Sequence, residues 1–203
     1  MGVVKLCPVA DATATYTTLI AVACAYYLTA TIGLTFAVPP GYATLLWPPA
    51  GIALGAAYVW GWKAALAAGF GSYMANLWVP SATDRAMVVL AGALPAVGAV
   101  VQSWVGAVLL HRYCDRDLRR WSASNVVRYA LVTIASCTIN GVWGPASLSF
   151  AGFMDQSTIA HNIQTWWLGD CLGALVFAPL LIFLVGETPV HGREQRQEAR
   201  PES

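Results

Sequence analysis

The chain has 203 residues, of which 58% are hydrophobic and 10% are charged, and its net charge is +1. A typical soluble domain is roughly 25% charged, so this composition excludes an ordinary soluble protein and indicates one that lies in a lipid bilayer. The near-neutral charge also argues against a nucleic-acid partner, since the chain has no dense basic face.

Long apolar runs predict six helices. Several windows of about 18 to 25 residues carry no charge, which is the length that crosses a ~30 Å hydrocarbon core. The predicted ranges are 13–38, 49–61, 62–79, 86–111, 125–150 and 158–186. The second range is short for a crossing at ~1.5 Å rise per residue, so we expect it either to tilt or to form a re-entrant hairpin with the third. The fold class is therefore all-α, a polytopic transmembrane bundle of about six spans.

The two ends of the chain differ from its apolar centre. We expect residues 1–12 to form a cytoplasmic N-terminal segment, 13–186 the transmembrane domain, and 187–203 a hydrophilic, disordered cytoplasmic tail. The first apolar run continues past any plausible cleavage point, which predicts an uncleaved first span. The tail is too small to be a catalytic or output domain.

A pair of prolines interrupts the apolar sequence between the first two predicted helices. Pro48 and Pro49 follow Trp47, and each lacks a backbone N–H and disfavours helical geometry in the residue before it. A new helix should therefore open near Gly51. Irregular backbone cannot face lipid inside a bilayer, so we expect this turn to be either a membrane-surface loop or a re-entrant bend.

The basic residues predict which way the chain faces. If the N-terminus is cytoplasmic, ten of the eleven lysines and arginines lie on the cytoplasmic side, and only Arg85 lies outside. Such an excess is the positive-inside signal of an inner-membrane protein. We therefore expect a multi-pass protein of the bacterial inner membrane with both termini in the cytoplasm.

Asp170 is the only acid within a predicted span. Ionised and unpaired, it would cost roughly 2.5–3.5 kcal/mol on insertion scales, so it should be protonated, hydrogen-bonded or in contact with water. Helical spacing puts it on one face with Asn162 and Trp166. Other side chains that could converge on it are the amides Asn76, Gln102, Asn140, Asn162 and Gln164. Two interpretations stay open: an interhelical hydrogen-bond clamp, worth about 0.6–2 kcal/mol, and a ligand site.

The sequence predicts neither an enzyme nor a metal or cofactor site. Its three histidines are far apart in sequence and in predicted topology, and its five cysteines are scattered, as small buried hydrophobic residues are. The HExxH, GxSxG and CxxC motifs are absent, and so is a phosphate-binding glycine loop.

Three sequence blocks occur in a fixed order: residues 27–54, with Trp47 to Gly51 at their centre, then 71–77, and then 165–181 around Asp170. Together they resemble the MASE1 family of bacterial integral-membrane sensory domains. The resemblance implies a multi-helix input module, usually fused ahead of a histidine kinase, a diguanylate cyclase or a related output domain, whose ligand is generally not established. Members are often described with about eight spans, whereas six are predicted here. Because no output domain follows residue 186, we expect a free-standing sensor, a sensor subunit acting in trans, or a fragment.

These observations lead to one functional hypothesis and two alternatives. The chain is expected to be a sensory input module that binds a small ligand or membrane partner and relays this to an output kinase or cyclase in trans; a second copy of the chain is a further expected partner. The alternatives are a small proton-coupled transporter and a structural subunit of a membrane complex. The predicted ligand site comprises Asp170, Asn76 and Asn140 as polar residues, Trp166 and Trp167 as walls, and Trp47, Pro48, Pro49 and Gly51 as the turn that shapes it.

Overall fold

The computed structural model describes residues 15–36, 44–77, 85–114 and 122–185, and the described chain is helical throughout apart from short turns and caps. Each predicted range corresponds to one helix. The helices are α1 (Tyr16–Leu34), α2 (Pro48–Trp60), α3 (Trp62–Asn76), α4 (Arg85–Tyr113), α5 (Ala123–Phe150) and α6 (Ile159–Val185), with a 3-10 turn η1 (Gln156–Thr158) before α6. The segments predicted at 1–12 and 187–203 lie outside the described residues.

Four of the described helices are long and apolar enough to cross a membrane: α1, α4, α5 and α6. Helices α2 and α3 have only 13 and 15 residues. At ~1.5 Å per residue they reach roughly 20 Å, which is short of a ~30 Å hydrocarbon core. The predicted count of about six spans is therefore not confirmed, although all six helices are present.

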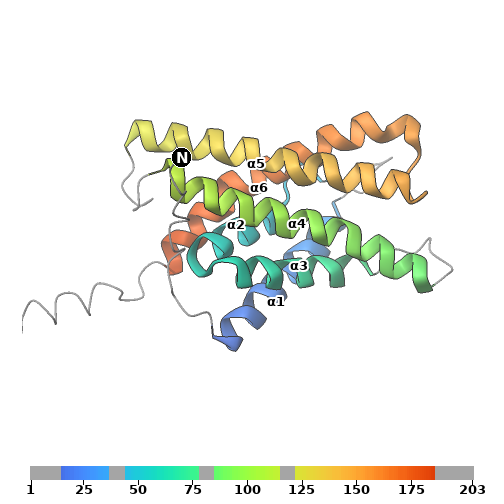
Figure 1. Ribbon diagram of the computed structural model, residues 1–203, viewed down its shortest axis with the longest axis horizontal. Helices are drawn as coiled ribbons and strands as arrows, with labels where there is room; N and C mark the ends of the chain where they lie inside the picture. The colour runs from blue at the N-terminus through green and yellow to red at the C-terminus, as the bar shows by residue number, and fades with distance from the viewer. Residues whose placement is uncertain (1–14, 37–43, 78–84, 115–121, 186–203) are drawn as a thin grey trace, which may run out of the picture.

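The long helices α4, α5 and α6 run side by side along the long axis of the molecule, and α2 and α3 form a hairpin against them (Figure 1). The hairpin turns at Gly61, whose φ of 76° lies in the left-handed region that glycine adopts without strain. Helix α1 packs on α2 and α3. One apolar core lies around Leu54, Leu110 and Ile182, and a second one lies between α1, α2 and α3.

Glycines bring α2 and α6 into backbone contact. A Cβ atom on Gly55 would lie 3.1 Å from the carbonyl oxygen of Ala178, and one on Gly51 would collide with the carbonyl oxygen of Gly173. Small residues at a spacing of four let helices approach closely in a bilayer, where packing replaces the hydrophobic effect as the driving force. The close contact between α2 and α6 therefore depends on glycine at these positions.

Candidate functional site

Helix α2 begins in the interior of the bundle. The backbone N–H of Trp47 donates to the carbonyl oxygen of Gly169, near the middle of α6, at 3.0 Å. A Cβ on Gly169 would collide with the carbonyl oxygen of Thr44, and one on Gly173 with that of Trp47. The irregular residues 44–47 thus lie against a glycine face of a candidate span, as the re-entrant interpretation predicts. Thr44 is buried there, whereas the side chains of Leu45 and Leu46 are exposed.

The two prolines explain how a helix can start at this depth. The first four N–H groups of an α-helix have no partner within the helix. Here Trp47 donates to Gly169, and Ala50 donates to the Trp47 carbonyl oxygen at 3.1 Å. Pro48 and Pro49 occupy the two positions between them and have no N–H to satisfy. None of the four positions therefore leaves a buried donor without a partner.

Asp170 connects three helices through amides. Its Oδ2 atom accepts a hydrogen bond from Gln102 Nε2 of α4 at 3.0 Å and one from Asn140 Nδ2 of α5 at 3.4 Å. The Oε1 atom of Gln102 in turn accepts from the backbone N–H of Asn140 at 3.0 Å. All three side chains are buried, with exposed fractions of 3%, 6% and 6% for Asp170, Gln102 and Asn140. We call these three residues the polar centre.

The polar centre holds an acid without a cation. Within the described residues, the groups that act directly on the Asp170 carboxyl are the two amides, and no lysine, arginine or histidine is among them. Its more distant polar neighbours are the Tyr26 hydroxyl of α1 and the thiols of Cys137 and Cys171. An intramembrane carboxyl of this kind can hold a proton, accept hydrogen bonds, or bind a ligand that brings a donor.

Most of the predicted site residues surround the polar centre. Trp167 packs on Gly141 of α5 and donates from Nε1 to the Ile134 carbonyl oxygen at 3.4 Å, while the Trp166 ring lies against Gly144. Trp47, Pro48 and Gly51 pack on α6 at Gly173, and Pro49, which lies between them in the chain, is fully buried. The exception is Asn76, whose Nδ2 donates to the Ser72 carbonyl oxygen of its own helix at 2.8 Å. Gln102 was not part of the predicted ligand site, but it was among the amides expected to converge on Asp170, and for Gln102 and Asn140 that expectation is confirmed.

Several buried polar atoms in this region have no hydrogen-bond partner. Among the described residues they are Thr133 Oγ1, Asn140 Oδ1, Asn162 Oδ1 and Trp166 Nε1. All four belong to α5 or α6. Buried polar groups nearly always have a protein or water partner, so each of these four atoms is an exception to that rule.

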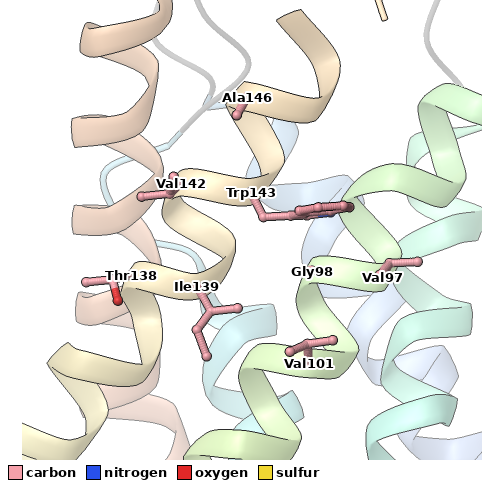
Figure 2. A pocket seen from close by; sticks show the side chains of 8 residues that line it. All are labelled: Val97, Gly98, Val101, Thr138, Ile139, Val142, Trp143 and Ala146. Carbon is pink, nitrogen blue, oxygen red and sulfur yellow. The ribbon is translucent and has the colours of Figure 1, made fainter. Parts of the chain in front are cut away.

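An apolar groove between α4 and α5 lies next to the polar centre. Its volume is about 490 Å³, and it is lined by Val97, Gly98, Val101, Thr138, Ile139, Val142, Trp143 and Ala146. Figure 2 shows the Trp143 ring reaching from α5 towards α4 above Gly98, with Ile139 and Val101 facing the space below. Trp143 Nε1 donates to the Leu94 carbonyl oxygen at 2.7 Å, which fixes the ring across the two helices. A Cβ on Gly98 would collide with Asn140 Oδ1, so one glycine separates the groove from the polar centre.

No group of three or more histidines, cysteines or acids could hold a metal ion within the described part of the chain. Of its cysteines, Cys114, Cys137 and Cys171 are buried and Cys24 is exposed. His111 stacks on Tyr58 with ring centroids 4.2 Å apart, at the end of the bundle where α2 and α4 finish. At the other end, Asp155 caps η1, and the Ser157 N–H that it accepts holds the pKa of its carboxyl below the usual range.

The fold and the polar centre define a class: a multi-pass helical membrane protein with two short helices and a buried acid that accepts hydrogen bonds from two amides. Residues 17–198 match the MASE1 family model, so the chain belongs to the MASE1 family and the resemblance is confirmed. MASE1 is a membrane-associated sensory domain rather than a catalytic one. No curated protein and no solved structure matches the chain.

Proposed function

We propose that this chain is a sensory input module of the bacterial inner membrane, which binds a small ligand or membrane partner and relays the event to a cytoplasmic histidine kinase or diguanylate cyclase. Membership of a sensory family supports the general role. The observation that carries the specific proposal is the polar centre, in which one acid of α6 holds α4 and α5 through hydrogen bonds.

The polar centre is suited to report binding because its hydrogen bonds are linked. Gln102 donates to Asp170 and accepts from the backbone of Asn140, so a group that competes for the carboxyl also disturbs the contact between α4 and α5. A ligand shifts an equilibrium only if it binds two packings with different affinity. Replacing one set of interhelical hydrogen bonds by another provides such a difference.

The distribution of basic residues supports a cytoplasmic position for the end of the bundle where α2 meets α3. Lys63 lies in the first turn of α3, Arg112 in the last turn of α4 and Arg128 in the first turns of α5. Figure 1 shows these three element ends on the same side of the molecule, together with the end of α6. By the positive-inside rule this side faces the cytoplasm, and both termini are then cytoplasmic.

A small proton-coupled transporter is the alternative that a specific observation favours. Transporters often bind substrate where a helix is broken near the bilayer midplane, beside an intramembrane acid. Here α2 begins beside the middle of α6, next to Asp170. The two functions differ in partners, because a transporter moves its substrate without an output protein.

Crosslinking in native membranes tests the proposal. The intact chain is crosslinked, purified in mild detergent and analysed by mass spectrometry, beside Asp170→Asn and, as the matched control, Asp155→Asn at an exposed acid. We expect a kinase or cyclase in the wild-type and Asp155→Asn samples, and an altered crosslink pattern in Asp170→Asn. Recovery of the chain without a signalling protein, together with proton-coupled uptake in proteoliposomes that Asp170→Asn abolishes, would decide for the transporter.

A further inference from the structure

The unpaired polar atoms on α6 follow one face of the helix towards its beginning. Asn162, Trp166 and Asp170 are spaced by four residues, so their side chains lie above one another. Asn162 is fully buried, with an exposed fraction of 0%, and its Oδ1 has no partner; Trp166 Nε1 is buried and has none either. Asn162 Oδ1 can accept a hydrogen bond, and Trp166 Nε1 can donate one. Both lie between Asp170 and the η1 end of α6.

The spacing of these groups fits single water molecules. Along the helix axis, residues four apart are separated by about 6 Å, and a water that joins two hydrogen bonds of about 2.8 Å each can bridge side chains spaced in this way. A buried water needs two to four polar partners. A water between Asn162 and Trp166 has an acceptor on one side and a donor on the other, and a water between Trp166 and Asp170 has a donor and the carboxyl.

We propose that these atoms line a hydrated track from the η1 end of α6 to Asp170, and that the species bound through it is a proton. This inference rests on the proposed function, and the signal that it assigns to the sensory module is the pH on the η1 side of the membrane. In the step itself, a hydronium ion transfers one proton to the Asp170 carboxylate, which leaves a neutral carboxylic acid and a water molecule. No bond between heavy atoms changes, and no other reactant is needed.

Because no described cation lies near the Asp170 carboxylate, a proton is the positive charge that can neutralise it. The titratable groups that face it are Tyr26 from α1, Cys137 from α5 and Cys171 from α6. Within the described chain, α4 contributes the neutral Gln102, and α2 contributes its first turn without any charged side chain. No cation in these ranges competes with a proton for the carboxylate.

Towards the opposite end of α6, Asp170 is followed by a hydroxyl that is already engaged and then by apolar side chains. The Tyr129 hydroxyl already donates to the carbonyl oxygen of Ala174 at 2.8 Å, one turn beyond Asp170. Beyond it lie the buried apolar side chains of Ala178, Ile182 and Leu110. Among the residues that the structure describes, Thr133 Oγ1 is the unpaired buried atom on this side, and it lies beside the Tyr129 hydroxyl, where the apolar side chains begin. Access from the η1 side only is what a sensor of pH requires, whereas a transporter needs access from both sides.

Infrared spectroscopy of the full chain in sealed vesicles tests the track. The band of the protonated Asp170 carboxyl is assigned by its loss in Asp170→Asn and its retention in Asp155→Asn. The orientation of the chain is found by labelling Gln156→Cys, an exposed position in η1, with an impermeant maleimide. The pH is then changed on one side of the membrane at a time, and deuterium oxide is added from each side in a second measurement.

We expect the band to follow the pH on the η1 side and to exchange with deuterium from that side. Trp166→Phe removes only the Nε1 donor, and Asn162→Leu removes the amide, so both should lose the fast response; Gln164→Leu, an exposed amide of the same helix, should keep it. A response to the other side, a response to neither side, or an unchanged response in both track variants would overturn the proposal. The deuterium measurement on wild type decides the matter if a variant does not fold. Because no partner protein is involved, failure here would leave the crosslinking test of the sensory role unaffected.

Discussion

At the scale of single residues, the polar centre balances donors against acceptors. The Oδ2 atom of Asp170 accepts hydrogen bonds from two amides that come from different helices, and all three side chains are buried. Removing an acceptor from buried donors costs more than the bond itself contributes, because each donor keeps its desolvation penalty. The stability of the bundle should therefore depend on the chemistry of this side chain more than on its size.

Substitutions at Asp170 test this dependence. Asp170→Asn keeps an acceptor oxygen and should change the free energy of unfolding little, whereas Asp170→Leu leaves Gln102 and Asn140 with unpaired donors and should cost on the order of 1–3 kcal/mol. Unfolding in mixed detergent micelles, followed by circular dichroism, provides the comparison. Equal stability of the Leu and Asn variants would show that the hydrogen bonds contribute nothing measurable.

The prolines of the re-entrant turn allow a second test with a matched control. Pro49 and Pro145 are both fully buried, but Pro49 occupies the second position of α2 and Pro145 lies inside α5. In Pro49→Ala the new N–H is buried and unpaired, which should cost about 1–3 kcal/mol. In Pro145→Ala the new N–H can donate to the carbonyl oxygen four residues earlier, which offsets the lost ring. We expect the same unfolding assay to show Pro49→Ala as the less stable variant, and the reverse order would contradict our account of how α2 begins.

At the scale of elements, the residue ranges of the helices could be predicted from sequence, but the level in the bundle at which each helix starts could not. The lengths of the apolar runs and the prolines place all six helices within a few residues, because both depend on local sequence alone. That α2 starts beside the middle of α6 depends on a glycine face, at Gly169 and Gly173, which accepts the backbone of another segment. A glycine pair in a sequence indicates close packing but not which segment fills the space.

The glycine face should tolerate no side chain at Gly173. A Cβ there collides with the carbonyl oxygen of Trp47, which is backbone and cannot rotate away. Overpacking of this kind typically costs about 1–3 kcal/mol. We expect Gly173→Ala to lower the unfolding midpoint and Leu172→Ala, at the neighbouring exposed position, to leave it nearly unchanged. A Gly173→Ala protein as stable as wild type would mean that residues 44–47 are not held against α6.

The same distinction holds for the site. Asp170, Asn140, Trp166 and Trp167 could be predicted because polar or large residues stand out in an apolar span, and the structure places them around one centre. Asn76 stood out for the same reason, yet its amide caps its own helix. Gln102 joins the centre because α4 packs between α3 and α5, a neighbour relation that one sequence does not reveal.

At the scale of the whole molecule, the buried acid Asp170 lies beside the contact between α5 and α6. These helices run antiparallel and meet at Gly141 and Trp167, one turn from Asp170. The beginning of α5 and the end of α6 carry exposed side chains such as Val127 and Leu184. A change of charge at the centre can thus reach the end that we assign to the cytoplasm through a shift of two packed helices. Shifts at helix interfaces of this type are about 1–2 Å.

The most direct measurement is therefore the distance between spin labels at Val127 and Leu184, introduced as unnatural amino acids so that the native cysteines stay in place. Pulsed electron paramagnetic resonance gives the distance distribution in reconstituted membranes at acidic and neutral pH, for wild type and for Asp170→Asn. We predict that the wild-type distribution moves with pH, by about 1–2 Å, and that the Asp170→Asn distribution stays fixed. If both proteins give the same distribution at both pH values, or move together, the protonation of Asp170 does not set the packing of α5 against α6.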